Sequence, residues 1–156
     1  MTREQILTHL ASANQVALQA VKDGHMPFGA ILVAPDFETV LLEQGNIDTV
    51  RHAENELARR ASQQYDEDYL WNCTLVTTIE PCAMCAGTQY WANIGSLVYG
   101  VSEEALKTMT GNHPDNPTMS LPCRQVFAAG QKEIQIHGPF AELEDEILEP
   151  HKSCWS

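Results

Sequence analysis

Four residues of this chain have the types and the spacing to hold a metal ion and to move protons: His52, Glu54, Cys82 and Cys85. Cys82 and Cys85 are three positions apart, which on a helix places two side chains on nearly the same face. Two thiolates on one face can share a tetrahedral zinc ion, and the positive end of a helix dipole lowers a thiol pKa and so favours the thiolate. The same spacing is also compatible with a redox pair or with two small core residues.

His52 supplies a third zinc ligand, and no second C-x-x-C or H-x-x-x-H arrangement supplies a fourth. Three protein ligands leave one position for water, and zinc lowers the pKa of that water toward neutrality. Glu54 could then take the proton of the water and pass it to a substrate. We therefore predict one Zn2+ per chain, with Glu54 as the catalytic residue. The competing interpretations are a structural zinc site completed by His113 or Cys123, and a glutamate that only stabilises the start of its helix.

Hydrophobic patterning predicts the elements that must position these residues. Apolar residues at helical spacing predict five helices, at residues 2–24, 52–64, 82–93, 102–109 and 139–152. Short apolar runs between turn residues predict five strands, at residues 29–34, 39–46, 73–79, 96–101 and 132–138. Strands that alternate with helices indicate an α/β sandwich in a single domain, residues 1–156. Residues 110–122, with three prolines, predict a long loop, and such loops in compact domains are usually functional.

Composition limits the classes of function. The 156 residues are 44% hydrophobic and 19% charged, which is typical of a globular domain. The net charge of -12 repels a phosphate backbone and the nine basic residues are scattered, which argues against a nucleic-acid partner. No apolar run reaches the roughly 20 residues of a membrane span, and the N-terminus lacks a signal-peptide pattern, so we expect a cytoplasmic protein without a membrane partner. Five cysteines, an odd number, argue against a disulfide framework.

The order of the two motifs is more specific than either motif alone. H-x-E at residues 52–54, followed by P-C-x-x-C at residues 81–85, resembles the signature of zinc deaminases of nucleobases. Residues 27–101 are similar to the cytidine and deoxycytidylate deaminase superfamily, most of all to its branch of bacterial guanine deaminases and tRNA adenosine deaminases. The resemblance implies a three-layer α/β/α sandwich around a central mixed five-stranded sheet, and a homodimer.

The resemblance also implies six substrate contacts, which it places at Asn46, Ala53, Phe28, Trp91, Asp115 and Trp155. Asn46 and the backbone of Ala53 would hold the ring of the substrate, and Phe28 and Trp91 would pack on its faces. Trp155 would cover the active site of its own chain or of a partner. By residue type alone, Asn46 fits a turn residue better than a substrate contact, and the three aromatic residues are of a type that is more often found in packing.

This sequence departs from the family pattern in two places. Asn55 stands where an aliphatic residue is usual, and residues 110–122 do not align with the segment that carries a guanine-reading aspartate, so Asp115 is a candidate by rough position. We predict a zinc-dependent hydrolytic deaminase of a free nucleobase or nucleoside that releases ammonia, with guanine as the first choice, giving xanthine. The alternatives are a tRNA wobble adenosine deaminase, a cytosine or aminotriazine deaminase, and a non-catalytic zinc-binding scaffold.

Overall fold

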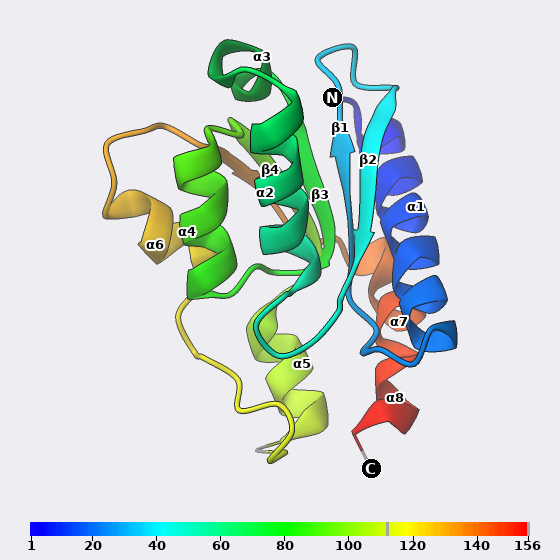
Figure 1. Ribbon diagram of the computed structural model, residues 1–156. Helices are drawn as coiled ribbons and strands as arrows, with labels where there is room; N and C mark the ends of the chain where they lie inside the picture. Colours follow the sequence, from blue (N-terminus) through cyan, green and yellow to red (C-terminus); the bar gives the residue numbers. More distant parts are fainter. Residues whose placement is uncertain (112, 156) are drawn as a thin grey trace.

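A five-stranded sheet with the strand order β2-β1-β3-β4-β5 forms the centre of the computed structural model, which describes residues 1–111 and 113–155 (Figure 1). The strands are β1 (Gly29–Val33), β2 (Val40–Gly45), β3 (Thr74–Ile79), β4 (Ser96–Val101) and β5 (Gln135–His137). β1 pairs antiparallel with both β2 and β3, whereas β3, β4 and β5 are parallel. The sheet is therefore mixed, as predicted.

Helices cover both faces of the sheet (Figure 1). α1 (Arg3–Lys22) and α7 (Glu144–Leu148) lie on one face, and α2 (Ala53–Gln64) and α4 (Ala83–Ala92) lie on the other. All five residues of β1 are buried, because successive side chains of a strand point to opposite faces and both faces are covered. This arrangement confirms the three-layer α/β/α sandwich.

The sheet brings the starts of α2 and α4 side by side. β2 leads through a short connection to His52, the N-cap of α2, and β3 leads through Glu80 and Pro81 to Cys82, the N-cap of α4. β1 is antiparallel to both β2 and β3, so β2 and β3 run in the same direction. The helices that follow them therefore begin at the same end of the sheet, and they pack against each other. Two motifs that are 30 residues apart in sequence thus meet.

The C-terminal region differs from the predicted single helix at residues 139–152. It forms a 3-10 turn at Ala141–Leu143, then α7, and then α8 (His151–Cys154). Pro150 explains the interruption between α7 and α8, since it has no backbone N–H with which to continue the hydrogen bonds of α7. The prediction of one continuous helix is therefore wrong, and the break lets the last residues turn back toward the start of β1.

Two short helices were not predicted from the sequence. α3 (Glu67–Trp71) begins behind Asp66, whose side chain accepts the Tyr69 N–H, and α6 (Cys123–Ala128) begins behind Pro122. α5 (Glu103–Thr110) agrees with its predicted range, and between α5 and α6 the described residues contain no helix or strand, as expected for a loop. Every helix in the described ranges is too short or too polar to cross a membrane.

Candidate active site

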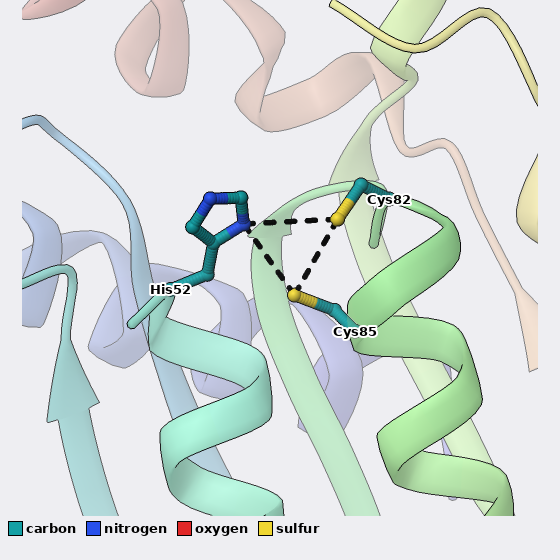
Figure 2. A group of neighbouring side chains, drawn as sticks. All are labelled: His52, Cys82 and Cys85. Carbon is teal, nitrogen blue, oxygen red and sulfur yellow. Dashed lines mark hydrogen bonds between the residues drawn. The ribbon is translucent and has the colours of Figure 1, made fainter. Parts of the chain in front are cut away.

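His52 and the two cysteines converge at the starts of α2 and α4 (Figure 2). The Nδ1 atom of His52 lies 3.7 Å from Sγ of Cys82 and 3.5 Å from Sγ of Cys85, and the two sulfur atoms are 3.6 Å apart. Tetrahedral zinc with ordinary bond lengths separates two sulfur ligands by about 3.8 Å and a sulfur and a nitrogen ligand by about 3.6 Å. The three atoms are therefore spaced as ligands of one Zn2+.

The surroundings of the ligands suit metal binding. Nε2 of His52 lies 2.8 Å from the Thr49 carbonyl oxygen, so Nε2–H donates there and Nδ1 keeps a lone pair directed at the sulfurs. The hydrogen bond between the two sulfurs and the nearby His52 ring lower the pKa of Cys82 to about 4, which makes it a thiolate. Among the described residues, neither His113 nor Cys123 lies in this ligand group, so the predicted alternative of a four-ligand structural site has no support.

Glu54 is a buried carboxylate close to the ligands, on which the charges of Cys82 and His52 act. Its side chain is 5% exposed, and the hydroxyl of Thr77 on β3 donates to Oε1 at 2.9 Å. Burial, followed by the negative charge of Cys82, raises the pKa of Glu54 to about 7. A carboxyl group with such a pKa can both accept and donate a proton near neutrality. The sequence analysis missed Thr77; the only signal was a pair of polar threonines inside a buried strand.

A cavity of about 1080 Å³ opens in front of Glu54 and the zinc ligands. Four of the predicted substrate contacts line it: Phe28, Asn46, Asp115 and Trp155. Asn46 is 6% exposed, and its backbone N–H donates to the Phe28 carbonyl, which joins the end of β2 to the segment before β1. Asp115 lies at the rim, with a side chain that is 73% exposed. The structure thus brings together residues from six separate segments of the chain.

The C-terminal segment forms one wall of this cavity. The Trp155 ring packs against Phe28 at 6.3 Å and against His113 at 5.9 Å between ring centroids. Its indole N–H donates to Nδ1 of His151, which is fully buried and also packs edge-to-face on Phe28. Burial lowers the pKa of His151 to about 4, so the ring is neutral and accepts this hydrogen bond. Within one chain, Trp155 therefore lies over the cavity of that same chain.

Two predicted contacts, Trp91 and Ala53, are not among the residues that line the cavity. Trp91 is 78% exposed near the end of α4, where it packs on Tyr90 and Lys132, and it does not line the cavity. In a single chain it cannot pack on a substrate bound at the zinc centre. Ala53 is fully buried as the first helical residue of α2, and its backbone N–H belongs to the first turn, which has no intrahelical partner.

Glu80 and Glu103 also line the cavity, and the sequence analysis did not assign either of them to the site. The Glu80 carboxylate accepts the backbone N–H of Glu103 at 3.1 Å and that of Cys123 at 2.8 Å, so it ties the starts of α5 and α6 to the residue before Pro81. Burial, followed by the charges of Glu54 and Cys82, raises the pKa of Glu103 to about 8. No local motif marks Glu103, because it reaches the site only through the parallel pairing of β3 with β4.

Comparisons with known proteins agree with this geometry. The sequence model of one protein family, the cytidine and deoxycytidylate deaminase zinc-binding region, matches residues 3–101 of this chain. The chain is 33% identical to a probable cytosine deaminase of Schizosaccharomyces pombe, over 97% of this chain and 93% of that protein. It is 35% identical to a guanine deaminase of Bacillus subtilis, over 59% of this chain and 62% of that protein.

The fold also matches a solved structure, that of a guanine deaminase from Nitrosomonas europaea. The TM-score is 0.73, the sequence identity is 19%, and the match covers 94% of this chain and 84% of the other. At this identity the likeness concerns the fold, which is the same three-layer sandwich.

Proposed function

The chain belongs to the cytidine and deoxycytidylate deaminase family and is a zinc-dependent hydrolase of C–N bonds in cyclic amidines, and we propose that its substrate is a free nucleobase or nucleoside. One observation carries the proposal. The buried Glu54 carboxylate, held by Thr77, lies beside the three zinc ligands at the floor of a cavity large enough for a purine.

His52, Cys82 and Cys85 would hold the zinc, which when bound would supply a Lewis acid that lowers the pKa of water toward neutrality. Glu54 accepts a proton from the attacking water and delivers it to the ring nitrogen next to the carbon that bears the amino group. A C–O bond forms at that carbon, the C–N bond breaks, and Glu54 passes the second proton to the departing ammonia. The hydroxyl of Thr77 holds the carboxylate in place through both transfers.

The charges of the cavity favour a substrate without phosphate. Its lining includes five carboxylate residues, Asp48, Glu54, Glu80, Glu103 and Asp115, and it includes no lysine or arginine among the described residues. A phosphate group would meet repulsion there without a compensating cation. A neutral base presents ring N–H and amino groups, and carboxylates accept hydrogen bonds from such groups.

We propose guanine as the first substrate and cytosine as the second. The partial similarity to a guanine deaminase and the position of Phe28 in the cavity support guanine. The similarity to a probable cytosine deaminase over nearly the whole chain supports cytosine. The guanine prediction depended on two aromatic residues, Phe28 and Trp91. Because Trp91 is exposed and lies outside the cavity, only Phe28 still supports guanine.

Ammonia release by the purified protein tests the proposal, with zinc measured on the same sample. The substrates are guanine, guanosine, cytosine, cytidine, adenine, adenosine and several aminotriazines. We expect turnover of at least one free base, and a loss of about 100- to 10,000-fold in Glu54→Gln with zinc retained. Glu56→Gln, in the same first turn of α2, is the matched control and should keep its activity. A zinc-loaded protein that turns over none of these substrates would contradict the proposal and favour the scaffold.

Three further statements are part of the proposal. Residues 1–156 form a single domain, since one five-stranded sheet lies at its centre. The protein is cytoplasmic, and it forms a homodimer. The exposed side chain of Trp91 is available for that dimer interface. The tRNA alternative requires a phosphate-binding surface, and a gel shift that weakens steeply with salt would revive it.

A further inference from the structure

Glu103 differs from the other carboxylates of the cavity in its hydrogen-bond and ion-pair partners. Glu80 accepts two backbone N–H groups, and Asp48 accepts two backbone N–H groups and forms an ion pair with Arg51 at 2.7 Å. Asp115 is at the rim, and Glu54 is held by Thr77. In contrast, no residue in the ranges 1–111 and 113–155 donates a hydrogen bond to the Glu103 carboxylate or forms an ion pair with it.

The backbone of Glu103 is nevertheless firmly placed. Its N–H is bound by Glu80, and Ser102 caps α5 by accepting the Ala105 N–H at 3.1 Å. Glu80 also precedes Pro81 and Cys82, so the same carboxylate ties Glu103 to the zinc-binding segment. The side chain of Glu103 is half-buried, and the groups that act on it electrostatically are those of the site itself, led by Glu54 and Cys82.

When a substrate fills the cavity and displaces water, a half-buried carboxylate to which no described residue donates is unfavourable unless the substrate supplies a donor. We propose that Glu103 is a specificity-determining residue that accepts a hydrogen bond from a second N–H group of the substrate, on an edge separate from the amidine that reacts at the zinc centre. The substrate class is then narrower than free bases in general: an unphosphorylated amino-heterocycle that carries a further ring N–H or amino donor. This inference rests on the proposed function, because it concerns the same cavity.

The test compares Glu103→Gln with Glu104→Gln, the exposed neighbour on the same turn of α5. The assays are made at pH 8.5, because burial raises the pKa of Glu103 to about 8 and most of its carboxyl groups are ionised at that pH. Glutamine keeps the size of Glu103 and resembles its neutral acid, so the comparison then isolates the negative charge. A hydrogen bond to a charged group contributes about 1.5–3 kcal/mol, so kcat/KM of Glu103→Gln should fall by about 10- to 150-fold, mainly through KM. Glu104→Gln should stay within about twofold, and zinc content should be unchanged in both.

Analogues of the substrate base that are methylated at a ring nitrogen complete a thermodynamic cycle, in which one change is made in the protein and one in the substrate. Methylation at the nitrogen that faces Glu103 removes the donor, so for that analogue the wild type and Glu103→Gln should have nearly equal kcat/KM. Calorimetric titration of the same base into Glu54→Gln and into Glu54→Gln/Glu103→Gln gives a readout that does not depend on turnover. We expect binding at least tenfold weaker in the double variant.

The outcomes separate the two proposals. If the wild type turns over a base and Glu103→Gln behaves like Glu104→Gln in kinetics and binding, the role of Glu103 is refuted while the function stands. If no base releases ammonia, the proposed function fails. In that case a base that binds more weakly to Glu103→Gln than to the wild type still supports the role of Glu103, and a panel without any binding overturns both.

Discussion

The two walls of the cavity are built in different ways. The zinc wall comes from two short motifs at helix starts, in which His52 and Glu54 are two positions apart and the cysteines three. The second wall includes Glu103, Asp115 and Trp155, which come from three separate segments and share no motif. The difference indicates that the residues proposed for the reaction can be recognised from local spacing, whereas those proposed to select the substrate can be recognised only once the chain has folded.

Removal of a zinc ligand tests the first wall and should have the largest effect. Cys85→Ser should lose zinc and should show only the background activity of a chelated sample, because two remaining ligands cannot hold the ion. Cys123→Ser is the matched control, since Cys123 is equally buried but lies outside the ligand group. Metal analysis and ammonia release on both variants check the prediction, which is wrong if Cys85→Ser retains a full equivalent of zinc.

The second wall contains a group that should make the stability of the fold depend on pH. This group is His151, which holds Trp155 by a hydrogen bond. The pKa of this ring is about 4 in the folded chain and about 6.5 in the unfolded chain, so the unfolded state binds more protons between these values. The free energy of unfolding therefore falls as pH drops below about 6.5, by about 2 kcal/mol at pH 5 from this group.

Denaturant unfolding at pH 7.5 and pH 5 checks this prediction in the wild type and in His151→Leu. The wild type should lose about 2 kcal/mol more than the variant between the two pH values. Equal losses would show that His151 does not titrate differently in the folded chain. Both proteins keep the same zinc ligands, so any loss of metal at low pH is common to both.

Thr77 allows a finer test of the zinc wall. Thr77→Val keeps the shape of the side chain but removes the donor to Glu54, so kcat should fall about tenfold, as expected for loss of one hydrogen bond of about 1.5 kcal/mol. Thr77→Ser should restore most of the activity, because it restores the hydroxyl. If serine does not rescue, the effect is one of packing rather than of positioning Glu54.

The smallest effects should distinguish two tryptophans. Trp155→Ala opens the wall of the cavity and should raise KM by a few-fold, since it contacts Phe28 and His151. Trp91→Ala should leave KM unchanged within about twofold but should weaken the proposed dimer, which sedimentation can measure. A reversed pattern, with KM raised only by Trp91→Ala, would place Trp91 at a substrate site completed by a partner chain.

Much of the fold was predictable from the sequence. The five strands and the helices α1, α2, α4 and α5 follow from apolar periodicity and turn residues, and their alternation predicted the sandwich. The short helices α3 and α6 were missed because one or two turns carry too little periodicity to be recognised. The C-terminal helix was predicted as continuous because apolar residues keep their helical spacing on both sides of Pro150, although this proline interrupts the backbone hydrogen bonds.

The sequence by itself predicted the zinc ligands and the neighbouring Glu54, because the spacing within each of the two motifs depends only on the geometry of a helix start. The sheet then brings the two helix starts together. Only the tertiary structure decided which other residues face them. Thr77 and Glu103 enter the site through strand pairing, and Trp91 leaves it through the orientation of α4. The direction of a side chain relative to a distant cavity depends on how whole elements pack, and the spacing of nearby residues does not contain that information.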